Sequence, residues 1–188
     1  MTALMHIGRQ PTSKIENLKW HEDIPSYSFE LKVHLGPSRI HDALRSGAPH
    51  TTPDVHNIIS KNEKEFPANF SGTERKRLFL VCAGAFINNR RTERVLAVLK
   101  QHQMQDIDLR TLLAIGEQNP ALCREIGKKS MRLVCIAQRL WHLNISHVCV
   151  LHQNDMDDNG TRNSIRLEPY HYGWSAEHVF VFEKTNRE

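Results

Sequence analysis

The chain has 188 residues, of which 39% are hydrophobic and 24% are charged. These fractions are close to those of ordinary folded proteins, so they exclude a wholly disordered chain and fit a single globular domain. The longest apolar run, Leu78–Ile87, has ten residues. A membrane-spanning helix needs about 20, so the run excludes such a span.

The first part of the chain divides into an arm and the start of a domain. Residues 1–25 carry scattered charges and little periodicity, so we expect a loosely ordered N-terminal arm. The remaining residues, 26–188, are expected to form one globular domain. In residues 26–35 apolar side chains alternate with polar ones, which is the period of a half-buried strand.

The middle of the chain, residues 52–144, is predicted to be mainly helical and basic. Thr52 followed by Pro53 is typical of a helix start. Ser71 and Glu74 have the spacing of a capping box, which favours a helix over a buried strand for the apolar run that follows. Further helices are predicted around residues 39–45 and 92–103, from Asp106 or Asp108 onward, and as a long apolar stripe from Asn119 to Trp141.

From residue 145 onward the hydrophobic period changes to two. This period predicts three strands, at residues 145–152, 164–171 and 178–183, joined by connections that suit an antiparallel meander. The predicted class is therefore α+β. About four to five helices in the middle would pack on a small, mainly antiparallel sheet formed by the early strand and the C-terminal meander.

Charge is distributed unevenly around the net value of +4. Residues 74–144 hold thirteen basic and six acidic residues, whereas the flanking segments are neutral or acidic. Such a distribution favours an anion-binding face, although an ordinary solvated helix surface would have the same composition. Lys128 and Arg132 would share one face of a helix. The candidate anion- or nucleic-acid-binding residues form three clusters: Arg75, Lys76 and Arg77; Arg90, Arg91 and Arg94; and Lys128, Lys129 and Arg132.

Two patterns suggest metal binding, and each has a simpler explanation. Residues 155–160 match the first half of a calcium loop, but Arg166 stands where a glutamate should complete the coordination, so an acidic hairpin loop is favoured. Twelve histidines raise the alternative of a site across a sheet, for example from His147, Cys149, His152 and His171. Hydrogen-bonded histidines on a half-exposed sheet explain the same residues. We therefore predict neither a metal ion nor a cofactor.

The four cysteines lie far apart and form no C-x-x-C pair. They are expected to be free thiols in the cytoplasm or another reducing compartment. Cys82 and Cys149 are the candidate nucleophiles of an enzyme, but a buried structural role is favoured because no histidine lies beside Cys82 in the sequence. No catalytic residue is predicted.

The function predicted from these features is non-catalytic. The basic middle would contact an anionic partner, either RNA or a nucleoprotein, or an anionic membrane surface that it binds peripherally. The aromatic residues of the C-terminal end could form a surface for self-association as a homo-oligomer or for contact with another protein, although most of these rings are expected to lie in the core. In size, basic charge, compactness and lack of motifs the chain resembles small matrix or accessory proteins of negative-strand RNA viruses. The alternative is a small cytosolic enzyme or effector with a Cys/His site.

Overall fold

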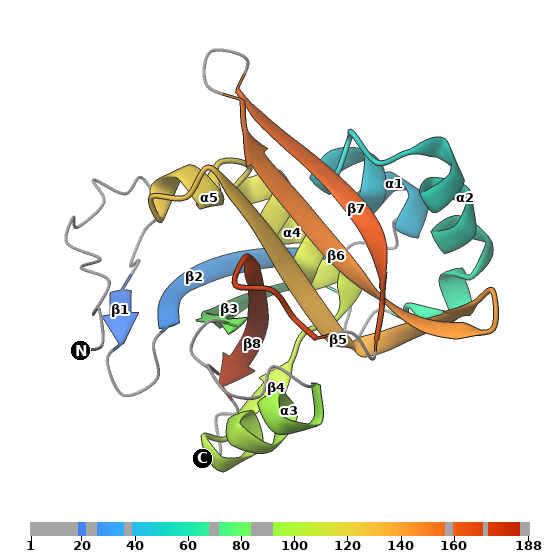
Figure 1. The fold of residues 1–188 in the computed structure, drawn as a ribbon. Helices are drawn as coiled ribbons and strands as arrows, with labels where there is room; N and C mark the ends of the chain where they lie inside the picture. The colour runs from blue at the N-terminus through green and yellow to red at the C-terminus, as the bar shows by residue number, and fades with distance from the viewer. Residues whose placement is uncertain are drawn as a thin grey trace.

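The computed structural model describes residues 19–21, 26–35, 39–67, 72–83, 92–156, 160–170 and 173–184. Within them, eight strands form one twisted sheet with helices on both faces (Figure 1). The strands are β1 (Lys19–His21), β2 (Ser26–Leu35), β3 (Gly72–Cys82), β4 (Met104–Asp106), β5 (Ser130–His142), β6 (Ile145–Asp155), β7 (Thr161–Pro169) and β8 (His178–Lys184). The helices are α1 (Ile40–Gly47), α2 (Pro53–Lys61), α3 (Thr92–Gln101), α4 (Leu109–Gln118) and α5 (Leu122–Glu125), with a 3₁₀ turn η1 (Glu63–Glu65).

The strand order is β1-β2-β3-β8-β5-β6-β7, and β4 pairs with the end of β8. Neighbouring strands are antiparallel except β5 and β8, which are parallel. The last strand of the chain therefore lies in the centre of the sheet. It is paired with β3 on one side and with β5 and β4 on the other.

The predicted architecture of a helical middle on a small sheet is wrong, because two of its segments are long strands. The run that contains Leu78 and Val81 forms the end of β3, not a helix, and Glu74 of the expected capping box lies in the same strand. Leu78 belongs to the core on one face of the sheet and Val81 to the core on the other. A strand covered on both faces is apolar throughout, and this pattern cannot be distinguished from that of a buried helix.

The long helix predicted from Asn119 to Trp141 is also wrong. Only the short helix α5 forms, and it ends before Gly127, whose φ of +73° is a left-handed conformation that glycine adopts without strain. The chain then enters β5, where the adjacent residues Leu133 and Val134 are both buried on opposite faces. The C-terminal meander is wrong as well, because β8 lies between β3 and β5 instead of pairing with β7.

Local signals outside these segments are confirmed. The strand predicted at residues 26–35 is β2. Thr52 is the N-cap of α2 and Pro53 is its first residue, as the sequence indicates. Asp108 caps α4, where its Oδ1 accepts a hydrogen bond of 2.6 Å from the Thr111 N–H. Most of the arm predicted at residues 1–25 lies outside the described residues, and residues 19–21 of it form the strand β1.

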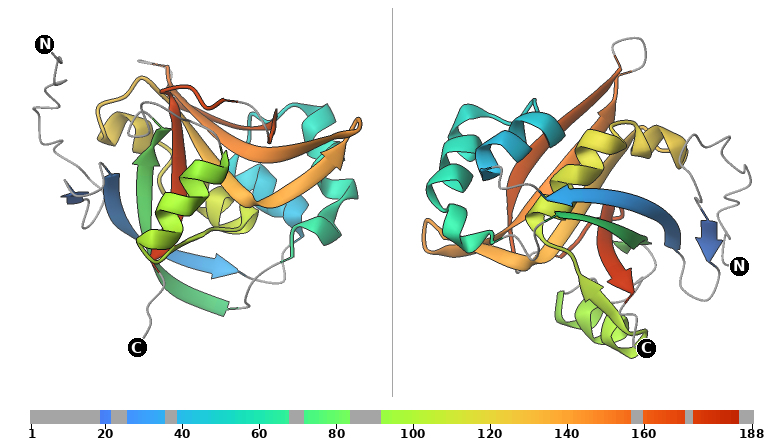
Figure 2. Two further views of the ribbon diagram at one scale, coloured as in Figure 1. Left: turned by 60° about the horizontal axis from the view of Figure 1, so that its bottom comes forward. Right: turned by 180° about the vertical axis from the view of Figure 1, so that it is seen from behind.

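Two cores lie on the two faces of the sheet. The larger is formed with α1, α2, α4 and α5, which cover one face when the molecule is seen from behind (Figure 2, right). There α1 crosses α4 at two glycines: a Cβ on Gly116 would lie 2.1 Å from the Gly47 carbonyl oxygen. The smaller core lies on the other face, beneath α3, where Val95 and Leu99 pack with Trp174. Among the described helices none is long and apolar enough to cross a membrane.

Candidate anion-binding groove

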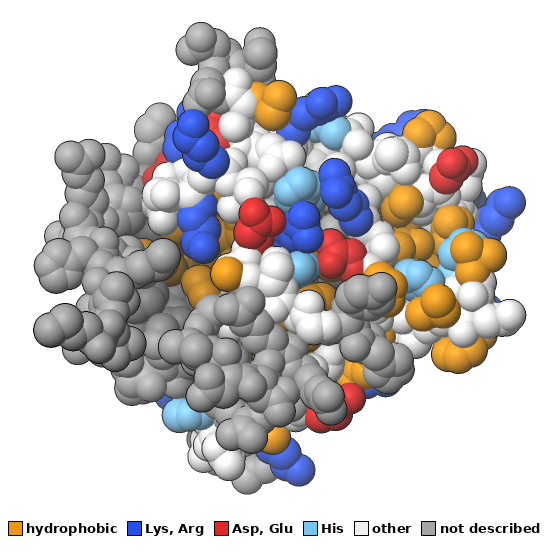
Figure 3. Space-filling view, in the orientation of Figure 1, with side chains coloured by type: hydrophobic (Ala, Val, Ile, Leu, Met, Phe, Trp, Pro, Cys, Tyr) orange, Lys and Arg blue, Asp and Glu red, His pale blue; other side chains and the backbone are white. Residues whose placement is uncertain are grey.

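The sheet face that carries α3 is apolar over only part of its area. On β6, Val148 and Val150 belong to the smaller core, whereas the next residue on that face, His152, lies beside polar neighbours. It pairs with Arg132 of β5 and with Ser164 of β7. No described helix covers this region, which we call the polar half of the face; it is formed by Arg132, His152, Arg162, Ser164, Arg166 and Glu168. Basic, acidic and histidine side chains are interspersed on this side of the molecule (Figure 3).

A groove of about 370 Å³ borders the polar half along the edge of β7. Its other wall is the connection between α1 and α2 together with the start of α2. Hydroxyl, amide, imidazole and guanidinium groups make up most of the lining. We call it the β7 groove; its lining residues are His50, Thr52, Val55, Asn154, Arg162, Ser164, Ile165, Arg166 and Leu167.

Hydrogen bonds hold the two walls together. The His50 N–H donates to the carbonyl oxygen of Asn163 at 3.0 Å. The Ile165 N–H donates to the Thr51 hydroxyl oxygen at 2.9 Å. The Asn163 carbonyl and the Ile165 N–H both belong to β7, which is an edge strand. The α1–α2 connection therefore satisfies backbone groups that an edge strand otherwise leaves unpaired. The groove is therefore a fixed feature of the fold.

Arg162 and Arg166 carry the positive charge of the groove. Both side chains are exposed, and within the described part of the chain no carboxylate lies within 4 Å of either guanidinium. Strand alternation puts them on the same face as Ser164, with about 13 Å between their Cα atoms. The planar guanidinium matches phosphate oxygens, so the pair can bind two anionic groups of one extended ligand.

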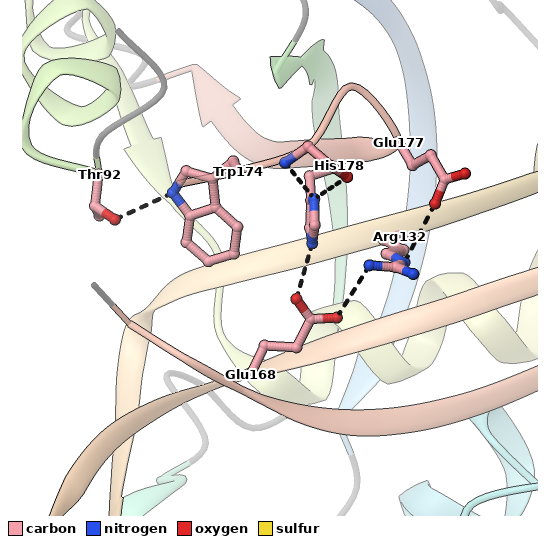
Figure 4. Close-up of polar contacts among 7 residues, drawn as sticks. Thr92, Arg132, Glu168, Trp174, Glu177 and His178 are labelled. Carbon is pink, nitrogen blue, oxygen red and sulfur yellow. Dashed lines mark hydrogen bonds and ion pairs between the residues drawn. The ribbon is translucent and has the colours of Figure 1, made fainter. Parts of the chain in front are cut away.

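Arg132 lies on the same half of the face but its charge is already balanced. Its Nη1 is 3.8 Å from Glu168 Oε1, and its Nε is 3.5 Å from Glu177 Oε2 (Figure 4). Glu168 also accepts a hydrogen bond of 2.8 Å from His178 Nε2. This hydrogen bond, more than the nearby charges, lowers the pKa of Glu168 below its ordinary value. Arg132 is thus part of an ion-pair network and is less available for a ligand than Arg162 or Arg166.

His178 joins the polar half to the covered half. The backbone N–H of Ser175 donates to its Nδ1 at 3.0 Å, so Nδ1 is the acceptor and Nε2 carries the proton given to Glu168. The imidazole lies edge-on to the indole of Trp174, with 5.1 Å between centroids. Trp174 Nε1 in turn donates to Thr92 Oγ1 at 3.1 Å, which ties the sheet to α3 (Figure 4).

Ser175, His178 and Glu168 have the connectivity of a hydrolytic triad but not its chemistry. The Ser175 Oγ lies 2.8 Å from His178 Nδ1. That nitrogen has one lone pair, which already accepts the Ser175 backbone N–H, so it is poorly placed to remove the hydroxyl proton. The imidazole is also only 4% exposed. The arrangement closes the turn before β8, and it gives no support to acyl transfer.

The first predicted cluster lies on β3, away from the groove. Arg75 and Arg77 are exposed, and the Arg77 guanidinium lies 5.6 Å from the centre of the Phe79 ring. Lys76 points to the other face and is buried, with its Nζ 2.8 Å from Glu183 Oε2. Burial alone would lower the pKa of Lys76, but the hydrogen bond and charge of Glu183 raise it above its ordinary value. Lys76 is therefore a structural ion-pair residue.

The other two clusters do not complete a basic face. Arg90 and Arg91 lie outside the described residues, and Arg94 lies on α3. Lys128 and Lys129 lie between α5 and β5, so the helical face expected for Lys128 and Arg132 does not exist. Lys128 is close enough to act electrostatically on Cys82, at the far end of β3. About 23 Å of strand separates that end from Arg75, so the clusters lie apart.

The groove residues were missed because of the charge of their segment. Residues 145–188 are acidic overall, so the charge distribution does not indicate an anion-binding site at Arg162 and Arg166. The sequence feature that indicates these residues is the alternation of side chains along a strand. In a strand, residues 162, 164, 166 and 168 share one face, and here that face reads Arg, Ser, Arg, Glu. The partner wall, with His50, comes from more than a hundred residues away and had no sequence signal.

The thiols and acidic residues support no reactive or metal site in the described part of the chain. Burial raises the pKa of Cys149 to about 12 and raises that of Cys82 above its ordinary value. The described residues contain no group of three or more His, Cys, Asp or Glu arranged to hold a metal ion. Asp155 of the acidic loop accepts hydrogen bonds from Arg124, one of them at 2.9 Å from Nε, whereas residues 157–159 lie outside the described ones.

No family model, curated protein or solved structure matches this chain.

Proposed function

We propose that the protein is a non-catalytic binding protein that holds single-stranded RNA in the β7 groove. The observation that carries the proposal is the pair of exposed arginines, Arg162 and Arg166, that form no ion pair within the described residues and line a groove rich in hydrogen-bond donors. Phosphate contacts from arginine supply most of the affinity for nucleic acids.

The shape of the site favours a strand over a membrane surface. Donors stand on both walls, with His50 and Thr52 facing Arg162 and Arg166 across the groove. An extended polyanion can reach both walls at once, whereas a flat bilayer surface meets only the rim. The exposed imidazole of His50 also offers a ring on which an unpaired base can stack.

We also propose that the protein works in a reducing compartment. All four cysteines are free thiols, including Cys135 and Cys149, which lie directly opposite each other on β5 and β6. Self-association through the C-terminal aromatic residues has less support. Tyr170, Trp174, Phe180 and Phe182 are buried in the smaller core, where they offer no contact surface.

Fluorescence anisotropy with a labelled 20-nucleotide oligo(U) RNA, across a salt series, tests the groove. The double variant Arg162→Gln/Arg166→Gln should bind at least tenfold more weakly at 0.1 M salt. The slope of log K against log salt should fall by about 1.4, because each lost phosphate contact removes about 0.7 for a single strand.

The matched control is Arg75→Gln/Arg77→Gln, which removes the same charge from exposed positions on β3. Its affinity should stay within about twofold of the wild type. An equal loss in both double variants would mean that net charge, not the groove, binds RNA. Absence of binding by the wild-type protein at 0.05 M salt would disprove the proposal.

A further inference from the structure

The connection between β5 and β6 is an unusual turn. Leu143 and Asn144 have φ values of +51° and +63°, as in a two-residue type I′ hairpin turn. This conformation suits Asn, Asp or Gly and is strained for leucine. Leu143 is nevertheless 79% exposed, so packing within the described part of the molecule does not compensate for the strain.

Two further apolar side chains flank the turn. Trp141 is 71% exposed and Ile145 is 46% exposed. Trp141 pairs with Ser146, and Ile145 pairs with His142, so the two apolar side chains point to opposite faces of the hairpin. With Leu143 at its apex, the hairpin carries an exposed apolar side chain on each face and at its end, although Ser146 shares the face of Trp141 and His142 shares that of Ile145. Three of the four exposed large hydrophobic residues in the described structure are therefore found here.

The hairpin itself carries no formally charged side chain near its turn. Residues 140–148, which we call the hairpin tip, contain no Asp, Glu, Lys or Arg. The first charged residue towards the body is Arg139, about 13 Å of strand from Leu143. The tip extends beyond the rest of the sheet (Figures 1 and 2), and hydrophobic side chains gather on that side of the surface (Figure 3).

We propose that the hairpin tip inserts into the surface of a lipid bilayer. A flat protein partner, or a second copy of this chain, would cover one face of the hairpin and leave the other apolar face in water. A fluid apolar phase surrounds the tip on all sides and so buries Trp141, Leu143 and Ile145 together. Indole rings settle at the membrane interface, which suits the exposed Trp141.

This site is separate from the groove proposed for RNA. About 23 Å of strand separates Ile145 of the tip from His152 beside the groove. The two sites therefore do not overlap, and a single molecule can bind RNA and a bilayer at once. The lipid proposal does not rest on the proposed function.

Vesicle flotation tests the tip. The wild-type protein is mixed with vesicles of phosphatidylcholine alone, and of phosphatidylcholine with 30% phosphatidylserine, in 0.1 M and 0.5 M NaCl. We expect binding to both compositions that persists at 0.5 M NaCl, because apolar insertion is little screened by salt. Leu143→Asn should lower the partition coefficient at least tenfold, and Trp141→Ser should do the same.

Leu143→Asn separates binding from folding. Asparagine suits the left-handed conformation, so the variant should melt at the wild-type temperature or higher. The matched control is Met156→Gln, which removes an exposed apolar side chain from the opposite end of β6 and should bind vesicles within twofold of the wild type. The variant Arg162→Gln/Arg166→Gln should also keep its vesicle binding, whatever becomes of its RNA binding.

Four results would overturn the proposal. The first is no vesicle binding by the wild-type protein. The second is equal binding by Leu143→Asn. The third is binding that requires phosphatidylserine and vanishes at 0.5 M NaCl, which would indicate adsorption through surface charge. The fourth is a change from dimer to monomer on Leu143→Asn in sedimentation velocity, which would make the tip a contact between copies.

Discussion

The two halves of the sheet face that carries α3 are built from the same strands and differ in what covers them. In the covered half, Val134 and Val150 pack with Phe180 beneath α3 and Trp174. In the polar half, two residues along the same strands, Arg132 and His152 stand where those valines would continue the core. The change in residue type follows the end of the helical cover.

This difference separates stability from binding. Apolar side chains that lose all contact with water stabilise the fold, whereas charged side chains at the surface contribute little to it and remain available to a ligand. Glu168 of the polar half lies at the boundary with the covered half, where it is hydrogen-bonded to His178. Substitutions should therefore lower the free energy of unfolding most in the covered half, less at the boundary and least in the rest of the polar half.

The largest effect is expected from Trp174→Ala in the covered half. The indole is buried, lies edge-on to Phe180 with 5.5 Å between centroids, and donates its N–H to Thr92. Its removal leaves a cavity and frees the contact to α3, so the free energy of unfolding should fall by about 3–5 kcal/mol. Urea unfolding followed by circular dichroism measures the change.

The control for Trp174→Ala is Thr92→Val. Valine has the shape of threonine but lacks the hydroxyl oxygen that accepts the hydrogen bond of the indole. The substitution should cost about 1–3 kcal/mol, because the Thr92 hydroxyl accepts the hydrogen bond of the indole and also donates to the carbonyl oxygen of Tyr170 at 2.9 Å, so two buried groups lose their partner. A loss below 1 kcal/mol for Trp174→Ala itself would mean that the indole does not hold α3 on the sheet.

An intermediate effect is expected from Glu168→Gln at the boundary. The variant loses the charge that pairs with Arg132 and weakens the hydrogen bond from His178, which should lower the free energy of unfolding by about 1–3 kcal/mol at pH 7. The exposed neighbour Glu177 provides the control. Glu177→Gln should change the free energy of unfolding by less than about 0.5 kcal/mol.

Glu168 also makes the free energy of unfolding depend on pH in the acid range. The folded-state pKa of Glu168 is lowered by the hydrogen bond from His178, so its contribution to stability is complete above the ordinary value of 4.5. It is lost as the pH falls from 4.5 through the folded-state pKa. Urea unfolding between pH 5 and pH 3 should therefore show a shallower decline for Glu168→Gln than for the wild type. An unchanged decline would contradict the assignment.

How much of the fold could be predicted depended on whether an element is covered on one face or on two. In β2, Phe29 and Leu31 face the larger core and alternate with residues on the other face, so the period of two identified the strand and both of its ends. At residues 78–81 of β3 and residues 133–136 of β5 both faces are covered, so the alternation is lost and the composition favours a helix. Strand order depends on long-range pairing, such as that of β8 with β3 and β5, which has no local signal.

The candidate site was less predictable than the fold. Three clusters were selected because basic residues are adjacent in the sequence, but adjacent residues on a strand point to opposite faces, as Lys76 and Arg77 do. The pair that shares a groove, Arg162 and Arg166, is spaced by four and sits in an acidic segment. The exposed Leu143 at a left-handed position could not be identified either, because the turn depends on where β5 and β6 pair.

The smallest effect on stability is expected from Arg166→Gln in the polar half. The same substitution should shift the pKa of the neighbouring His152. The free energy of unfolding should change by less than about 0.5 kcal/mol, because the side chain is exposed and forms no ion pair with a described residue. Burial first, and then the charges of Arg166 and Arg132, lower the pKa of His152 below its ordinary value.

Removal of the Arg166 charge should therefore raise the pKa of His152 towards 6.5 without reaching it, since burial and Arg132 remain. Below pH 6.5 the unfolded chain binds a proton more readily than folded His152 does, so the wild type loses stability as the pH falls through this range. Arg166→Gln should lessen that loss. NMR titration of the His152 ring measures the shift, with Arg162→Gln as the control, because Arg166 is the charge that lowers the pKa of this ring most. An equal shift in the two variants would show that the polar half responds to net charge and not to the position of Arg166.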